Sequence, residues 1–265
     1  MKIESIQSYL VANGYIVQIR TDTGITGLGQ TAYWGYPEAI EAIVKRFENY
    51  LIGQNPLRIE HHWQYLYRMS PFKGNALSGA ISAIDIALWD ILGKFVGVPL
   101  YQLLGGKYRD SIPTYSAAGS PEAALEAIEA GFTAVKMGFS KGVGSEDFAR
   151  VRAISAAVGD RGQLLIDSLG AFKLHEAINA GRKLDELGNI GWFEDALMPE
   201  DMASYPLLVE ALDTAVCVGE TFSNRFQFRD LFAQRGADLI NPDLSRSGGI
   251  SETKRIAEMA DTFGI

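Results

Sequence analysis

The chain has 265 residues, the composition of an ordinary globular protein and a net charge of −8. This length suggests one barrel or two smaller domains, and the acidic balance argues against a nucleic-acid partner, because nucleic acids select basic surfaces. Cys217 is the only cysteine, which excludes an internal disulfide and a thiolate metal site and fits a reducing cytoplasm.

The first 30 residues read as a small antiparallel meander. Strands are expected near 3–10 and 15–20, and the turn residues 21–24 lead into a third short strand near 25–30. The glycines at 24, 27 and 29 do not match a nucleotide-binding fingerprint, and we interpret them as a flexible loop. The N-terminus lacks the apolar segment of a secretory signal, and no run approaches about 18 apolar residues, so we expect neither secretion nor a membrane partner.

Helical periodicity follows the meander. It predicts helices at 37–51, 57–69 and 76–96, and the last of these ends at Gly97 with Pro99 just beyond. Strands followed by helices are typical of an α+β fold. We therefore predict an α+β domain over residues 1–111.

From about Ile112 the pattern changes to alternating strands and helices, which is typical of a parallel sheet in an α/β barrel. About six such units are present, and the chain stops at Ile265 where a seventh strand would begin, whereas a closed TIM-type barrel needs eight. We predict an incomplete (β/α) barrel domain over 112–265, either truncated at its C-terminus or completed in another way. The expected strands are 112–117, 132–138, 163–167, 190–194, 215–220 and 239–242, and the expected helices begin near 120, 145, 174, 201, 225 and 251.

Three apolar runs each end in an acid, at Asp167, Glu194 and Glu220, and a fourth run ends at Asp243. Strand ends of a (β/α) barrel converge on one mouth, so these carboxylates can meet there. Crowded carboxylates repel one another, and a divalent cation with oxygen ligands is the usual way to hold them. A single such acid is more often a helix cap or a loop residue, but the repeated register favours a magnesium site at the barrel mouth.

The segment 80–90, with 99–105 after it, resembles the long helix motif of the enolase superfamily, specifically its mandelate racemase/muconate lactonizing branch. The resemblance covers nearly the whole chain and implies a capping domain joined to a modified barrel. It also implies one Mg²⁺ per chain, held by Asp167, Glu194 and Glu220. The metal would bind a substrate carboxylate and stabilise the enediolate that forms when the α-proton leaves.

The family commonly carries Lys-x-Lys on the second barrel strand, with one lysine as the base. Here Lys136 matches the first lysine, and Gly138 stands where the usual base would be. Lys136 is therefore expected either to orient the substrate carboxylate or to act as the base itself, and a lysine pointing into solvent is the plain alternative.

Asp243 matches the aspartate that orients a catalytic histidine in racemases and acid-sugar dehydratases. That histidine would follow within about ten residues beyond Ile265. The histidines present, His61, His62 and His175, are expected to be structural or solvated.

Two departures from the family pattern lie beside the expected ligands: Leu169 stands where Asn is usual and Ala196 where Pro is usual. Asp195 is interpreted as a residue that supports the ligands or caps a helix. In the capping domain, Tyr33, Trp34 and Tyr36 match a mobile lid that contacts substrate, although such aromatic side chains often only pack two domains together.

These observations favour a carbon–oxygen lyase that dehydrates a sugar acid to a 2-keto-3-deoxy acid. One alternative is a racemase or epimerase of a 2-hydroxy acid, which needs bases on both faces of the substrate and is weakened by Gly138. The other is a truncated chain that binds metal without catalysis. The expected partner is a small-molecule carboxylate, and the resemblance implies a homo-oligomer.

Overall fold

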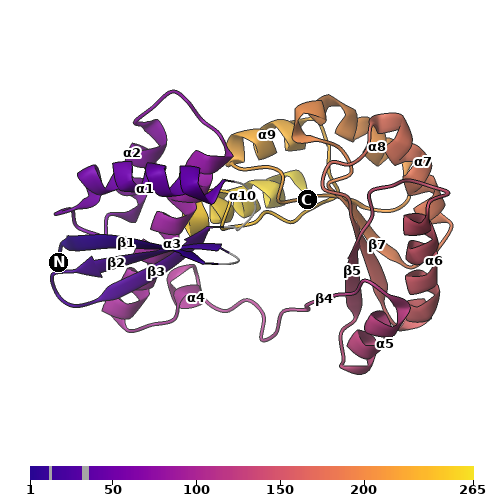
Figure 1. Ribbon diagram of the computed structural model, residues 1–265, viewed down its shortest axis with the longest axis horizontal. Coiled ribbons are helices and arrows are strands. Elements are labelled where there is room, and N and C mark those ends of the chain that lie inside the picture. The colour runs from indigo at the N-terminus through magenta and orange to yellow at the C-terminus, as the bar shows by residue number, and fades with distance from the viewer. Residues whose placement is uncertain (12–13, 32–35) are drawn as a thin grey trace. The chain divides into compact units, whose positions relative to one another are not determined.

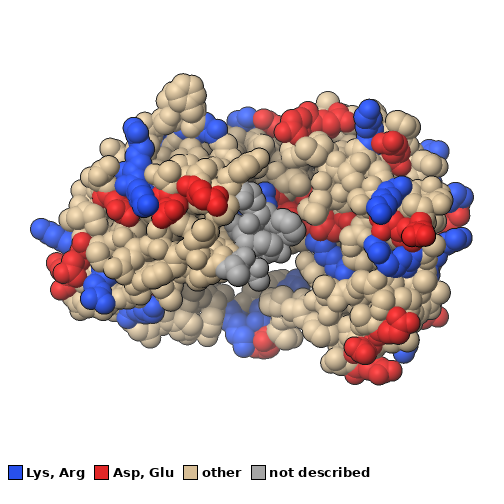
Figure 2. Space-filling view, in the orientation of Figure 1, with Lys and Arg blue, Asp and Glu red and all other residues tan. Residues whose placement is uncertain are grey.

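The computed structural model describes residues 1–11, 14–31 and 36–265, which form two compact units (Figure 1). The first consists of Met1–Asp110, Ser223–Gln227 and Pro242–Met259, and the second of Ser111–Phe222, Phe228–Asn241 and Ala260–Ile265. The described residues form a three-stranded antiparallel sheet in the first unit and a six-stranded parallel sheet in the second. On the face seen in Figure 2, acidic and basic side chains are interspersed over each unit.

The sheet of the first unit is the predicted meander. Its strands run in the order β1 (Ile3–Val11), β2 (Gly14–Thr21) and β3 (Thr26–Thr31). Side chains alternate along β2, so that Tyr15, Val17 and Ile19 are buried. The turn between β2 and β3 uses Gly24 at φ +84°, a backbone conformation that glycine adopts without steric cost.

Helices cover this sheet and complete its core. They are α1 (Pro37–Leu51), α2 (Ile59–Arg68), α3 (Asn75–Val96) and the short α4 (Leu100–Leu103), which sequence reasoning missed. By length and composition α3 could cross a membrane, but 61% of its most apolar window is buried inside the protein. Its apolar side chains join the core cluster that contains β2, so α3 is the central core helix of this unit.

The interpretation of Gly27 and Gly29 as part of a flexible loop is wrong. Both glycines lie in β3, against the backbone of α3. A Cβ at Gly27 would lie 2.1 Å from the carbonyl oxygen of Ala87, and one at Gly29 would lie 1.8 Å from that of Ala83. The glycines are therefore required by a close approach of helix to strand, which sequence periodicity does not reveal.

We expect Gly29→Ala to destabilise the protein, because the new methyl group overlaps the Ala83 carbonyl and α3 must move. Overpacking of this kind costs about 1–3 kcal/mol or more. Urea unfolding followed by circular dichroism measures the change. The control is Gly119→Ala, since a Cβ there would meet no atom within 4 Å; equal midpoints for the two variants would contradict the prediction.

The second unit contains the predicted barrel-type sheet, which confirms the predicted fold class. Its strands pair in parallel and in chain order, and Figure 1 shows α6 and α7 along the outer side of β5 and β7. The strands are β4 (Ser116–Ala117), β5 (Ala134–Gly138), β6 (Gln163–Asp167), β7 (Ile190–Glu194), β8 (Val216–Val218) and β9 (Leu239–Ile240). The remaining helices are α5 (Pro121–Glu129), α6 (Glu146–Val158), α7 (Leu174–Asp185), α8 (Tyr205–Ala211), α9 (Arg225–Ala233) and α10 (Gly249–Phe263).

Several predicted elements are shorter in the structure, and two of them differ most. The strand predicted over 112–117 is reduced to Ser116–Ala117, because Pro113 cannot donate a backbone hydrogen bond and Ile112 is 71% exposed. The helix predicted near 201–212 begins as a 3-10 segment, Pro199–Ser204, and becomes α-helical only over α8. Neither difference changes the order of the strands.

The strand register fixes which residues are neighbours at the carboxyl edge of the sheet. Gly138 of β5 pairs with Asp167 of β6, and Asp167 pairs with Glu194 of β7. Asp167 and Glu194 therefore lie side by side, as their positions at the ends of consecutive strands predicted, while the meeting of Glu220 with them stays a prediction.

Candidate active site

Lys136, Asp167 and Glu194 form a compact charged cluster at the carboxyl ends of β5, β6 and β7. The Lys136 Nζ lies 2.9 Å from the Asp167 Oδ2 and 2.9 Å from the Glu194 Oε2. The side chains of Lys136 and Asp167 are 17% and 15% exposed, and that of Glu194 only 1%. The lysine therefore points toward the two carboxylates rather than into solvent.

Glu194 is held at both carboxylate oxygens. The Trp192 Nε1–H donates to Oε2 at 2.9 Å, and the Asn241 Nδ2–H donates to Oε1 at 3.3 Å. A Cβ at Gly219 would lie 3.1 Å from Oε1, so a glycine at this position lets the chain after β8 approach the carboxylate. Sequence reasoning missed Trp192 and Asn241; the available signal for Trp192 is its position two residues before Glu194, on the same face of β7.

Burial and the neighbouring Asp167 carboxylate raise the pKa of Glu194, and the Lys136 ammonium offsets part of this effect. Burial by itself would lower the pKa of Lys136, but its contacts with Glu194 and Asp167 outweigh that effect and raise the pKa above its usual range. The Lys136 ammonium also lies 5.7 Å from the centre of the Tyr115 ring, which packs edge-on against Trp192. Cys217 is buried in the core of this unit, and burial raises the pKa of its thiol.

The donor set suits a hard divalent cation. One ammonium contacts both Asp167 and Glu194, so a single cation can be shared by these two carboxylates, and carboxylate oxygens are the ligands that Mg²⁺ prefers. Over residues 1–11, 14–31 and 36–265, however, no three His, Cys, Asp or Glu side chains form a ready-made metal site. Glu220, half-buried in the turn after β8, stays a predicted third ligand.

Asp243 lies in the first unit, in the loop that leads to α10. Its Oδ1 accepts hydrogen bonds from the backbone N–H of Ser245 at 2.8 Å and from the Ser245 hydroxyl at 2.6 Å. The Thr31 hydroxyl donates to the Ser245 carbonyl, and the buried Asp85 of α3 accepts from both the N–H and the hydroxyl of Ser251. The loop is thus held in place by residues of β3 and α3, while the role of Asp243 in catalysis stays a prediction.

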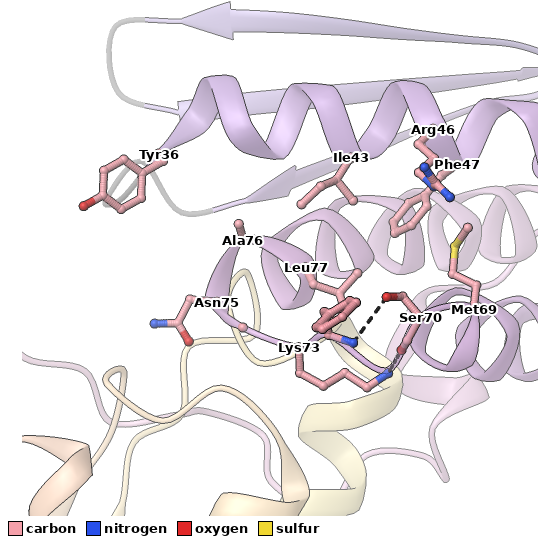
Figure 3. Close-up of a pocket in the computed structure, with 12 residues that line it drawn as sticks. Tyr36, Ile43, Arg46, Phe47, Met69, Ser70, Lys73, Asn75, Ala76 and Leu77 are labelled. Atoms are coloured by element: carbon pink, nitrogen blue, oxygen red, sulfur yellow. Dashed lines mark hydrogen bonds between the residues drawn. The ribbon is translucent and has the colours of Figure 1, made fainter.

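Two of the predicted lid residues, Tyr33 and Trp34, lie outside the described residues. Tyr36 is 80% exposed and borders a cavity of about 880 Å³ in the first unit. Figure 3 shows Tyr36 at the opposite end of this cavity from Arg46 and Met69. The contact of the lid with substrate stays a prediction.

The three histidines are placed as expected. His62 is buried, and its ring nitrogens lie 2.9 Å from the Tyr50 hydroxyl and 2.8 Å from the Asn55 carbonyl. Burial lowers the pKa of His62, so the ring is neutral and structural. His61 and His175 are exposed.

Comparison with known proteins gives the family. Residues 4–105 match the family described as mandelate racemase/muconate lactonizing enzyme, N-terminal domain, and residues 120–265 match the enolase C-terminal domain-like family. The chain is 35% identical to a D-galactonate dehydratase of Verminephrobacter eiseniae, in an alignment of 281 positions that covers 100% of this chain and 73% of that protein. It is 33% identical to a D-xylonate dehydratase of Haloferax volcanii, with 100% and 71% covered.

Solved structures with a similar fold also match the chain. The 3,6-anhydro-D-galactonate cycloisomerase of Zobellia galactanivorans has a TM-score of 0.94 at 33% identity, covering 100% of this chain and 78% of that one. An enolase of Agrobacterium radiobacter, solved with sodium and L-malate bound, has a TM-score of 0.91 at 30% identity, with 100% and 73% covered. The chain therefore belongs to the mandelate racemase/muconate lactonizing enzyme family of the enolase superfamily, among its carbon–oxygen lyases of the dehydratase type.

Proposed function

We propose that this protein is a Mg²⁺-dependent dehydratase that converts a sugar acid to a 2-keto-3-deoxy acid. The observation that carries the proposal is the contact of one ammonium, that of Lys136, with two carboxylates at adjacent strand ends. Similarity to D-galactonate and D-xylonate dehydratases supports the substrate class.

Asp167, Glu194 and Glu220 would hold the metal. When bound, Mg²⁺ supplies positive charge that stabilises the enediolate and offsets the low acidity of the α-proton. Lys136 lies beside two of these carboxylates, where it either orients the substrate carboxylate or accepts the α-proton. Asp243 would assist the group that protonates the departing hydroxyl, the role that its match to the family motif implies.

The reaction balances without a further reagent. The base removes the α-proton, and the electron pair of that C–H bond forms the enediolate. The β-carbon–oxygen bond then breaks, the hydroxyl leaves as water after taking up a proton, and the enol product tautomerises to the 2-keto acid.

Racemisation needs a base on each face of the substrate, and Lys136 is the basic side chain that the described residues place in this cluster, so dehydration is favoured.

The test is to incubate the protein with Mg²⁺ and a panel of sugar acids, including galactonate and xylonate, in D₂O and to follow the α-proton by NMR. We expect one acid to lose its α-proton signal, followed by the signals of a 2-keto-3-deoxy product, and a chelator to prevent both. Mg²⁺ binding with every α-proton retained would overturn the proposal. Exchange with return of the starting acid or its epimer would replace dehydration by racemisation.

We further propose a cytoplasmic location and a homo-oligomeric state. The buried, unpaired Cys217 supports a reducing compartment. Sedimentation velocity tests the oligomeric state. A single boundary at the mass of the monomer would contradict a homo-oligomer.

A further inference from the structure

Asp195, the residue after the proposed ligand Glu194, is fully buried. Its carboxylate accepts hydrogen bonds from the turn that carries Glu220, another proposed ligand. Its Oδ1 accepts the backbone N–H of Gly219 at 2.9 Å, and its Oδ2 accepts the backbone N–H of Thr221 at 3.3 Å. These two residues flank Glu220 on either side. One carboxylate therefore fixes the backbone before and after Glu220.

The backbone of Asp195 makes connections to the same strand ends. Its N–H donates to the Cys217 carbonyl of β8 at 3.0 Å, and its carbonyl accepts the N–H of Gly170 at 2.6 Å. Next to it, the Glu194 carbonyl accepts the N–H of Ser168 at 3.0 Å. Ser168 and Gly170 belong to the turn that follows Asp167, so the turn of each proposed ligand is connected to Asp195 or to its neighbour.

The backbone at this point is held in an uncommon conformation. Asp195 has φ +43° and Leu169 has φ +46°, whereas residues other than glycine rarely adopt positive φ. Such conformations persist only where the surrounding contacts enforce them, and they gather at functional sites. Here the enforcing contacts are the hydrogen bonds from Gly170, Gly219 and Thr221.

We propose that Asp195 is a positioning residue that sets the spacing of the Asp167, Glu194 and Glu220 carboxylates for a divalent cation. The proposal rests on the proposed metal site and adds to it a residue that does not itself bind the metal. Residues that orient metal ligands in this way typically change metal affinity about 10–100-fold when they are replaced.

The test variant is Asp195→Asn, which keeps the side-chain shape and tolerates positive φ. Its amide group has one acceptor where the carboxylate has two, so an NH₂ group must face the N–H of Gly219 or Thr221. We expect Mg²⁺ affinity, measured by titration calorimetry, to fall about 10–100-fold. We also expect the amide hydrogens of Gly219 and Thr221 to exchange faster by NMR. If this variant does not fold, Asp195→Gly removes the carboxylate while accepting the positive φ.

Asp185 supplies a matched control, because its carboxylate makes the same kind of contact before β8 rather than after it. It accepts the N–H of Asp213 at 3.3 Å and the N–H of Thr214 at 2.7 Å. We expect Asp185→Asn to lower thermal stability and leave Mg²⁺ affinity unchanged. A loss of affinity in Asp195→Asn alone is then an effect on the metal site rather than on the fold.

The outcomes separate this proposal from the proposed function. If the wild-type protein binds Mg²⁺ and Asp195→Asn binds it equally well, Asp195 does not position the ligands. If the wild-type protein binds no Mg²⁺, the proposed metal site is wrong and the positioning of ligands for a cation is wrong with it. Unchanged hydrogen exchange of the Gly219 and Thr221 amides in Asp195→Asn would also contradict the proposal that the Asp195 carboxylate holds this turn.

Discussion

Replacing Lys136 by methionine is expected to abolish α-proton exchange while leaving Mg²⁺ binding intact. Methionine has a similar length but has no charge and cannot accept or donate a proton. Loss of a general base or of an orienting cation typically lowers the rate about 10²–10⁴-fold. NMR in D₂O measures the exchange. Exchange at the wild-type rate in this variant would remove Lys136 from the mechanism.

The same substitution has a predicted effect on stability. Lys136 is the cation between Asp167 and Glu194, and removing one partner of a buried ion pair costs about 3–5 kcal/mol. We therefore expect the metal-free variant to melt at a lower temperature and to regain more stability than the wild type when Mg²⁺ is added. The control is Lys141→Met, which removes an exposed lysine from the loop after β5 and is expected to change neither property.

Lys136→Arg distinguishes the two roles left open for Lys136. Arginine keeps the positive charge and the hydrogen-bond donors but is not deprotonated in proteins. If Lys136 orients the substrate carboxylate, this variant should retain measurable exchange. If Lys136 is the base, exchange should be lost while the substrate still binds.

Sequence reasoning placed the strands that carry the site because their signals are local. β6 and β7 were predicted to the residue, since each is a short apolar run bounded by loop residues and ending in an acid. Parallel pairing of consecutive strands then makes Asp167 and Glu194 neighbours. The contact of Lys136 with both acids follows from its position on the adjacent strand β5.

Other features depend on contacts between distant segments, and sequence reasoning did not find them. The hydrogen bond of Asn241 to Glu194 joins residues 47 apart, and no local pattern specifies it. The positive φ of Asp195 is imposed by Gly170, Gly219 and Thr221 together, so an acid-acid pair in the sequence gives no sign of it. For the same reason the sequence does not show that the glycines of β3 are required by the close contact of this strand with α3.

Glu194→Gln is expected to abolish Mg²⁺ binding and, with it, α-proton exchange. The Glu194 Oε1 accepts from Asn241, and Oε2 accepts from Trp192 and contacts Lys136. A glutamine amide has one oxygen and one NH₂ group, so in either orientation a donor must face a donor. A buried group left unsatisfied in this way costs about 1–3 kcal/mol, and the loss of charge removes a metal ligand.

Titration calorimetry checks the affinity, with Glu210→Gln, an exposed acid on α8, as the matched control. Unchanged Mg²⁺ affinity in Glu194→Gln would contradict the metal site.

The two substitutions at the ion pair, Lys136→Met and Glu194→Gln, distinguish a metal site from a purely structural contact. A structural ion pair predicts that Lys136→Met and Glu194→Gln both lower stability and that neither depends on Mg²⁺. A metal site predicts opposite responses, because Lys136→Met leaves two carboxylates that Mg²⁺ can stabilise, whereas Glu194→Gln removes one of them.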